Sequence, residues 1–320
     1  MKIFTRKNDS SKGSGIRISE LSRKSLLAGG MLLLFSVTIH AQDLEARSYS
    51  VVPKGMHAAA LAYTFSKGNV VADFTSPVQD LNITTSIINL GYVQTFGLFN
   101  KLARVQVGMP YGFLDGTAKV FGSDTSGTRN GFFDAKVKFG MNLLGSPVLT
   151  PKEFRLFQEH TVLGASIVIS IPIGQYFPDK LINLGSNRWG FKPEIGFSHR
   201  EGRLYYEFYT GIWMFTNNNA YFKNNSQLKE NPLFSFQAHV DYVFKSQIWV
   251  AINGGFANGG QTTLNGIERN DDQRNWRLGG TFSMPFNAHQ SIKAMINTGV
   301  ATKAGQNYTA FTLVYQYIWC

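Results

Sequence analysis

The chain has 320 residues, a formal net charge of +11 and a single cysteine. Charged residues make up 16% and aromatic residues 14% of it, whereas soluble globular chains carry about 25% charged residues. After the N-terminal region there is no run of about 20 apolar residues, which excludes helical membrane spans. This composition argues against an ordinary soluble enzyme, and its 32 glycines favour strands and turns.

The first 41 residues have the layout of a signal peptide. A basic region precedes an apolar run from Leu26 to Ile39, which is followed by His40-Ala41-Gln42. The run is too short for a confident membrane span, so we expect cleavage after Ala41 and export of the protein. Residues 42–54 are then expected to form an N-terminal periplasmic segment, and residues 55–320 the folded domain.

Apolar and polar residues alternate along twelve segments, which is the pattern of β-strands. From Leu163 to Ile171, for example, every odd-numbered position is apolar, whereas the even-numbered positions are mostly glycine or serine. The even number of segments lets both chain ends lie on one side of a barrel. The predicted strand cores are His57–Ser66, Asn82–Phe96, Leu102–Tyr111, Phe132–Met141, Thr161–Ile171, Trp189–Ser198, Leu204–Phe215, Leu233–Phe244, Ile248–Phe256, Trp276–Met284, Ser291–Val300 and Tyr308–Trp319.

The connections between these segments alternate between long and short, as in outer-membrane barrels with long external loops and short periplasmic turns. The connection 142–160 is long where a short turn is expected, which indicates either a periplasmic excursion or a misplaced strand. A soluble β-sandwich is disfavoured because its exposed face would carry more charge. We therefore predict an all-β fold, a transmembrane antiparallel up-and-down β-barrel of about 12 strands. The long connections are 67–81, 112–131, 172–188, 216–232 and 257–275, and the short ones include 97–101, 199–203, 245–247 and 287–290.

Closure of the barrel follows from the membrane, because each unpaired backbone group in hydrocarbon costs several kcal/mol. The last strand must therefore pair with the first. Its outward aromatic residues resemble the C-terminal signal that the barrel assembly machinery recognises, with Cys320 as one additional residue. We interpret Cys320 as incidental, and a chain with one cysteine forms no internal disulfide. In an earlier segment, the residues predicted to face lipid are Phe133, Ala135, Val137 and Phe139.

Ionisable residues recur on the opposite face of the predicted strands, which would line the lumen. One interpretation is that opposite charges on neighbouring strands pair with one another and tie the wall together. The other is that they form a polar constriction that selects solutes, as charged rings do in channels. These lumen candidates are Arg104, Asp134, Lys136, Lys138, Lys192, Glu194, Glu207, His239, Asp241, Arg277 and Lys293.

Enzymatic, metal and nucleic-acid functions find little support in the sequence. His239 and Asp241 share one face of a strand but lie two residues apart, about 7 Å, which fits wall residues better than a catalytic pair. Metal-binding spacings such as HExxH and CxxC do not occur. No basic surface interleaved with aromatic residues points to nucleic acid. We therefore expect no catalytic residues and no cofactor.

The connection that joins two predicted strands at the centre of the chain carries a specific motif. The runs Pro172-Ile173-Gly174-Gln175-Tyr176 and Leu184-Gly185-Ser186-Asn187-Arg188-Trp189 resemble the MetA-pathway phenol-degradation family of outer-membrane proteins. The resemblance extends over nearly the whole mature chain. It implies a β-barrel that passes aromatic or other apolar nutrients across the outer membrane, with no established catalytic residues.

Within this motif, we place six residues at the external rim of the barrel. Arg188 would either meet a solute or lipopolysaccharide phosphate, or bond loop carbonyls, and Trp189 would anchor the membrane interface. Pro172 and Gly174 would reshape the backbone where a strand ends. The rim residues are Pro172, Gly174, Tyr176, Asn187, Arg188 and Trp189.

The functional hypothesis is an outer-membrane channel for passive uptake of small apolar or aromatic compounds. Its expected partners are outer-membrane lipid and lipopolysaccharide, the barrel assembly machinery and the solutes themselves, and we expect a monomer. One alternative is a non-transporting structural or adhesive barrel, which a lumen filled by side chains would favour. Another is a lipid hydrolase, which requires a Ser within hydrogen-bond reach of a His on the lipid-facing surface.

Overall fold

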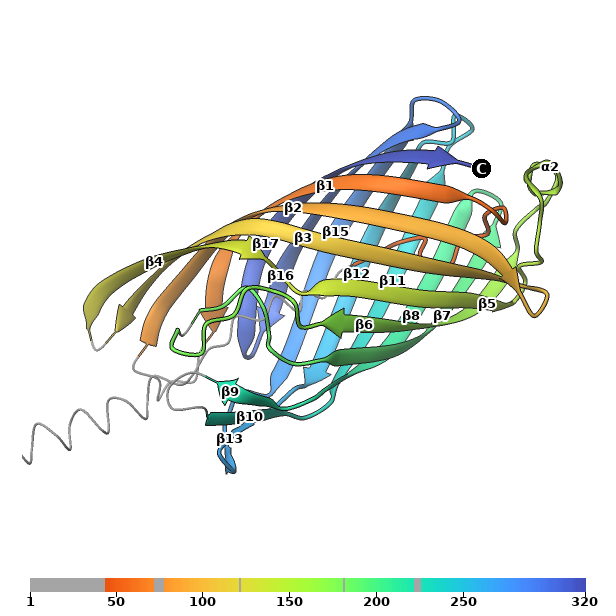
Figure 1. Ribbon diagram of the computed structural model, residues 1–320. Coiled ribbons are helices and arrows are strands. Elements are labelled where there is room, and N and C mark those ends of the chain that lie inside the picture. The colour runs from red at the N-terminus through yellow and green to blue at the C-terminus, as the bar shows by residue number, and fades with distance from the viewer. Residues whose placement is uncertain (1–43, 72–77, 121, 181, 222–225) are drawn as a thin grey trace, which may run out of the picture.

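The computed structural model describes residues 44–71, 78–120, 122–180, 182–221 and 226–320. Twelve strands of its thirteen-stranded antiparallel sheet close into a barrel (Figure 1). Eleven of the twelve predicted strand cores lie within barrel strands to within one residue, and several strands extend beyond them. The predicted core Phe132–Met141 is instead interrupted at Phe133 and Asp134, which belong to no strand, and most of the connection predicted at 112–131 is strand. The barrel strands are β1 His57–Val71, β2 Val78–Leu98, β3 Lys101–Val120, β5 Ala135–Leu144, β6 Thr161–Ile171, β7 Gly190–Glu201, β8 Leu204–Phe215, β11 Leu233–Val243, β12 Trp249–Gly259, β15 Gln273–Pro285, β16 Gln290–Thr302 and β17 Gly305–Trp319.

The barrel closes between its first and last strands, as predicted. β1 and β17 pair without a register shift from His57 opposite Trp319 to Val71 opposite Gly305. The remaining strand of the main sheet, β4 (Ser123–Phe132), pairs with β3 and continues that wall beyond the barrel (Figure 1). A separate four-stranded sheet contains β9 (Asn218–Tyr221), β10 (Ser226–Glu230), β13 (Thr262–Leu264) and β14 (Ile267–Glu268).

The two ends of the barrel differ in their connections. At one end, here called the turn end, short connections join β2 to β3, β7 to β8, β11 to β12 and β15 to β16. The opposite end, the loop end, carries the longer connections and the four-stranded sheet (Figure 1). The long connection between β5 and β6 lies at the turn end and contains a short helix, α2 (Pro151–Phe154), so no strand was misplaced there. Thr150 and Glu153 form a capping box at the start of this helix.

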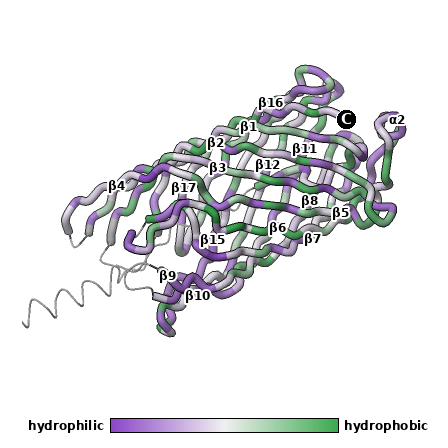
Figure 2. The backbone as a smooth tube through the Cα atoms, viewed as in Figure 1, coloured by the Kyte–Doolittle hydropathy of each residue, from purple (hydrophilic) through white to green (hydrophobic). Residues whose placement is uncertain are grey.

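The outward-facing positions of the barrel strands are largely apolar. Figure 2 shows hydrophobic and hydrophilic residues alternating along the strands. On β17, the outward residues Phe311, Leu313 and Tyr315 are exposed, whereas Ala310 on the inner face is buried. A surface of this kind is stable against hydrocarbon and unfavourable in water.

The prediction that Phe133 faces lipid is wrong. Phe132 pairs with Tyr111 and Lys136 pairs with Gly108, so three residues from Phe133 to Ala135 lie opposite only two residues of β3. This one-residue excess resets the alternation of side chains, as a β-bulge does. Phe132 consequently remains 49% exposed on the outer surface, whereas Phe133 turns inward and is 6% exposed.

Gly145, in the turn that starts the β5–β6 connection, can be compared with Gly55, which has nearly the same φ. The comparison tests whether close packing at Gly145 is required for folding. Gly145 and Gly55 have φ values of +75° and +77°, but a Cβ at Gly145 would lie 1.6 Å from the carbonyl oxygen of Thr161, whereas one at Gly55 would meet no atom within 4 Å. We expect Gly55→Ala to cost about 1 to 2 kcal/mol of folding free energy, the penalty of the left-handed conformation alone. Gly145→Ala should largely prevent folding, as measured by the heat-modifiable band shift in gel electrophoresis. Equal effects of the two substitutions would contradict this account.

Candidate functional site in the barrel lumen

Residues Leu44–Ser50, here called the N-terminal plug, lie inside the barrel. We expected them to belong to a periplasmic segment, but their side chains and backbone bond to inward-facing residues of the wall. Ala46 to Tyr49 form a turn, and Leu44 and Tyr49 are buried. The Leu44 side chain packs against Gly255 of β12. The plug therefore narrows the lumen at its turn end.

Tyr49 occupies a slot made by two glycines. Gly164 of β6 and Gly196 of β7 are register partners, and a Cβ at either one would lie within 2.2 Å of the Tyr49 ring. The Tyr49 hydroxyl lies 2.9 Å from the hydroxyl of Ser166 and donates to Glu194 at 3.1 Å. A larger residue at either position would displace the Tyr49 ring, so the two glycines determine how deeply the plug inserts into the lumen.

The charged lumen candidates hold the plug by its backbone. Arg104 donates hydrogen bonds of 2.8 Å to the carbonyl oxygens of Ser48 and Ser50. Glu207 accepts a hydrogen bond from the amide of Arg47, and the Lys138 ammonium lies 2.7 Å from the Ser48 hydroxyl. Charge-assisted bonds of this kind are roughly twice as strong as neutral ones. The plug is therefore docked by the wall.

The remaining charged candidates also lie on the inner face. Glu194 accepts a 2.7 Å hydrogen bond from Lys192 and lies 3.4 Å from the Lys138 ammonium. The guanidinium of Arg277 lies 3.8 Å from the centre of the Tyr308 ring. Lys192 lies on the same strand as Glu194, and Lys138 lies on β5, which β6 separates from β7, so these contacts are not the pairs between neighbouring strands that the structural interpretation describes. A role of these residues in selecting solutes stays a prediction.

His239 and Asp241 do not form a catalytic pair. The Nδ1 atom of His239 lies 2.8 Å from the Asn253 side chain, which in turn donates to Thr281 at 2.9 Å. Asp241 is fully buried on the same strand. The ring nitrogens of His57, His199 and His289 bond to Tyr92, Thr161 and the Ile318 carbonyl, respectively, and none of these partners is a serine.

Glu159, in the turn-end connection, couples that connection to the plug. Its carboxylate accepts a 3.4 Å hydrogen bond from the amide of Val51 and lies 4.0 Å from the Arg47 guanidinium. Burial raises the pKa of Glu159, and the nearby positive charge of Arg47 opposes that rise. The plug is thus held by the turn-end connection as well as by the barrel wall.

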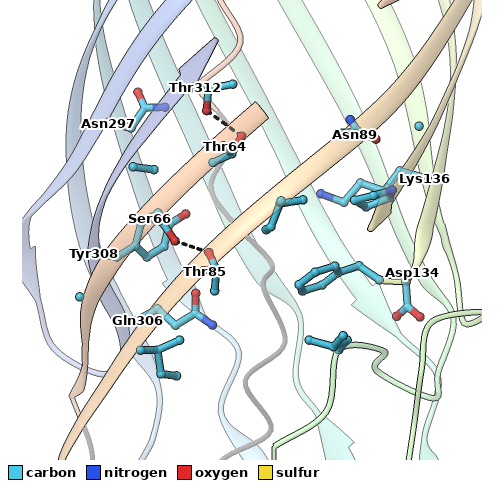
Figure 3. Close-up of a pocket in the computed structure, with 18 of the residues that line it drawn as sticks. Thr64, Ser66, Thr85, Asn89, Asp134, Lys136, Asn297, Gln306, Tyr308 and Thr312 are labelled. Carbon is cyan, nitrogen blue, oxygen red and sulfur yellow. Dashed lines mark hydrogen bonds between the residues drawn. The ribbon is translucent and has the colours of Figure 1, made fainter. Parts of the chain in front are cut away.

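A cavity of about 250 Å³, here called the upper pocket, lies in the lumen toward the loop end (Figure 3). One side is apolar and is formed by Val70, Ile83, Ile87, Phe133 and Leu184. The other side carries hydroxyl and amide groups, including the hydrogen-bonded pairs Thr64–Thr312 at 2.9 Å and Ser66–Thr85 at 2.6 Å. This two-sided lining suits a small molecule with an apolar body and a polar group.

Two amide oxygens lining the upper pocket lack partners among the described residues. They are the Oδ1 atoms of Asn89 and Asn297, which are buried and accept no hydrogen bond. A buried acceptor without a donor costs free energy. Both asparagines also line a second cavity of about 410 Å³ that extends to the plug at Leu44, Glu45 and Ser48. The two cavities adjoin through shared lining residues.

Asp134 fixes the loop-end connection that carries the family motif. Its carboxylate accepts hydrogen bonds from the amides of Gly174 and Ser186, at 3.0 and 2.8 Å, and from the Ser186 hydroxyl. Gly174 and Gly185 approach so closely that a Cβ on either would lie 2.7 Å from the other's backbone. The Leu184 side chain is thereby placed in the lumen, where it joins the apolar cluster of Phe133.

The other rim residues also anchor this connection. Asn187 donates a 2.9 Å hydrogen bond to Asn218, which itself donates to the Tyr176 hydroxyl at 2.9 Å. Trp189 is 43% exposed and stacks on Phe191, and its role as a membrane-interface anchor stays a prediction. The family motif therefore fixes the position of the connection between β6 and β7.

Arg188 has a different partner from the ones we expected. It is 3% exposed, pairs with Glu230 of the four-stranded sheet and lies 4.4 Å from the Phe215 ring centre. A buried guanidinium cannot reach a lipopolysaccharide phosphate. Burial raises the pKa of Glu230, and the charge of Arg188 opposes this effect. The ion pair between Arg188 and Glu230 links the family motif to the four-stranded sheet.

Several important residues were missed by sequence reasoning. Tyr49 lies before the first strand, where no alternation marks it. Gly164 and Gly196 form the slot because they lie opposite each other on β6 and β7, and alternation within a single strand does not contain this pairing. Within the part of the chain that the structure describes, no cluster of three His, Cys, Asp or Glu residues could hold a metal ion. In that same part, no helix is long and apolar enough to span a membrane.

Comparison with known proteins agrees with this architecture. A family model described as "Putative MetA-pathway of phenol degradation" matches residues 64–319. The structure is similar to the COG4313 outer membrane channel from Pseudomonas putida F1, with a TM-score of 0.74, 16% identity, and coverage of 87% of this chain and 100% of that one. The transport unit of the autotransporter AIDA-I from Escherichia coli gives a TM-score of 0.50 at 10% identity, with 91% and 97% coverage. No curated protein matches the sequence.

Replacing Tyr49 should loosen the plug. Tyr49→Ala removes the ring from the glycine slot, so we expect ion conductance in planar bilayers to rise severalfold. Tyr49→Phe keeps the ring and loses only its two hydrogen bonds, each worth about 1 kcal/mol, and should stay near the parent value. If Tyr49→Ala conducts no better than Tyr49→Phe, the ring does not hold the plug.

Replacing Asp134 should release the loop-end connection. Loss of even one charge-assisted hydrogen bond, about 1.5 kcal/mol, makes local opening about tenfold more frequent. Asp134→Ala should therefore speed tryptic cleavage after the exposed Lys180 by about tenfold or more. Asp124→Ala, on the exposed β4 strand, is the matched control. Unchanged cleavage in Asp134→Ala would show that the loop is held by other contacts.

Proposed function

The chain belongs to the MetA-pathway of phenol degradation family, and we propose that it is an outer-membrane channel for passive uptake of small apolar or aromatic compounds. The observation that carries this proposal is the two-sided upper pocket, which adjoins a second cavity extending to the plug. A lumen filled by side chains alone would have no such space. The similarity in fold to the Pseudomonas putida F1 channel supports the same function.

We propose the location and partners of the protein from the character of its surface. A closed barrel with an apolar outer face is suited to the outer membrane, reached by export and by the barrel assembly machinery. Its external parts would lie among lipopolysaccharide and its wall in lipid. We propose that it acts as a monomer, because the closed barrel encloses one complete lumen.

One observation favours the alternative of a non-transporting barrel. The plug occupies the turn end of the lumen and is held by several charge-assisted bonds. In a channel that conducts solutes along the barrel axis, the plug must shift to let a solute pass, whereas in a structural or adhesive barrel it would stay permanently docked. The two functions therefore differ in whether solutes cross a membrane that contains the protein.

Flux measurements separate these functions. Purified protein is reconstituted in liposomes, and uptake of an aromatic alcohol, an aromatic acid and a sugar of similar size is compared with protein-free vesicles. We expect faster uptake of the two aromatic compounds than of the sugar, because the upper pocket offers an apolar wall opposite polar groups. Absence of flux for every solute would favour the structural barrel.

The ion pair between Lys192 and Glu194 is the strongest candidate for a charge filter. We expect the Lys192→Met/Glu194→Gln double substitution to change the ratio of anion to cation permeability severalfold, measured as reversal potential in planar bilayers. The pair Asp179 and Lys180 lies in an exposed loop, and Asp179→Asn/Lys180→Met provides the matched control. An unchanged permeability ratio in the lumen variant would remove the basis for a filter there.

A further inference from the structure

The strand pairing of the barrel wall is interrupted beside the upper pocket. β5 and β6 pair from Ala135 opposite Ile171 toward the turn end. Beyond this point the wall continues as β4, which pairs with β3 alone among the described strands. β6 ends at Ile171, so no neighbouring strand covers the other edge of β4 there. The bulge at Phe133 and Asp134 lies at this interruption.

The interruption is closed by the connection that follows β6. The amide of Gln175 donates a 2.8 Å hydrogen bond to the carbonyl oxygen of Phe132, and the Gln175 side chain packs against Gly131. This is the one backbone bond found between residues 172–176 and β4 in the described structure. The β1–β17 and β6–β7 ladders are continuous, and those of β2–β3, β5–β6, β7–β8 and β15–β16 contain only local shifts or skipped residues. The closure here therefore rests on fewer backbone hydrogen bonds than the ladders between barrel strands.

The outer side of the interruption lies at the edge of the apolar surface. Phe113, Phe132 and Ile173 are exposed around it, and Tyr111 packs edge-on against both phenylalanines at 5.7 and 5.0 Å. One outward position further along β3, the surface becomes polar at Asp115. The interruption consequently faces the outer margin of the hydrocarbon layer, where a lipid-soluble molecule is stable.

The inner side of the interruption is the apolar side of the upper pocket. Phe133 and Leu184 line that pocket, and Asp134 fixes the loop segment that carries Leu184 (Figure 3). Apolar side chains therefore lie both outside and inside the interruption. The charged group between them is the Asp134 carboxylate, which already accepts hydrogen bonds from the amides of Gly174 and Ser186.

We propose that the interruption between β4 and the segment Pro172–Tyr176 is a lateral portal, through which apolar solutes pass between the upper pocket and the membrane. The proposal rests on the proposed function and deepens it by assigning a route. Lipid-soluble molecules leave the barrel through the wall, and the plug at the turn end need not move for them. Hydrophilic solutes have no such exit and depend on displacement of the plug.

A reversible staple tests the portal. Phe132→Cys and Gln175→Cys are combined in a Cys320→Ser background, so that the oxidised protein is joined across the interruption. Uptake of the fluorescent arylamine N-phenyl-1-naphthylamine is followed in vesicles whose outer leaflet is lipopolysaccharide. We expect oxidation to slow arylamine uptake at least fivefold and reduction to restore it. Flux of a small sugar should be the same in both states.

A second staple is the matched control. Leu61 and Leu90 are exposed register partners on β1 and β2, away from the interruption, and their cysteine variants are joined in the same way. The portal is refuted if the Phe132–Gln175 staple leaves arylamine uptake unchanged or if the control staple slows it equally. Should the unmodified protein fail to accelerate arylamine uptake over protein-free vesicles, both the portal and the proposed apolar transport are wrong.

A substitution pair decides the question if the staple does not form. Gln175→Pro removes the amide that bonds Phe132, whereas Gln175→Ala keeps it. We expect severalfold faster arylamine uptake with Gln175→Pro and the parent rate with Gln175→Ala, in protein shown to be folded by its heat-modifiable band shift. Equal uptake by the two variants would refute the portal.

Discussion

Pairing of every backbone amide and carbonyl group in hydrocarbon is the constraint on which this structure depends. It requires the uninterrupted pairing of β1 with β17, and it fixes which face of each strand meets lipid. In the closed barrel the apolar side chains face lipid. The polar side chains therefore face the lumen, where they need hydrogen-bond partners. The plug supplies many of those partners, since its backbone and Tyr49 bond to Arg104, Glu207 and Glu194.

The inward charges illustrate how one set of residues can serve both structure and transport. An unpaired charge in a lumen of low dielectric constant is costly, so Glu194 is bonded by Lys192, Lys138 and Tyr49 together. The same bonds hold the plug. Any solute that displaces the plug must therefore replace these bonds with its own or with water. Displacement of the plug from the turn end therefore depends on the charged residues of the wall.

The sequence was sufficient to predict the twelve barrel strands and their inward face, because side chains alternate between lipid and lumen with a period of two residues. It did not predict β4 or the four-stranded sheet, which lie in segments expected to be connections. It was not sufficient to predict the position of Phe133, because a one-residue excess depends on the register between β3 and β5, which alternation within one strand does not contain. The plug escaped prediction for a related reason. Tyr49 is recognisable only once Gly164 and Gly196 are known to be neighbours.

The bulge at Phe133 and Asp134 links most of the features of the loop end. It ends the regular wall, turns Phe133 into the lumen and places the Asp134 carboxylate against the backbone of the family motif. The motif then brings Leu184 onto Phe133, which completes the apolar side of the upper pocket. Without the additional residue, Phe133 would face lipid and alternation would remain in phase. A one-residue change of register has thus produced the upper pocket, the position of the loop segment that carries Leu184, and the interruption of the wall beside them.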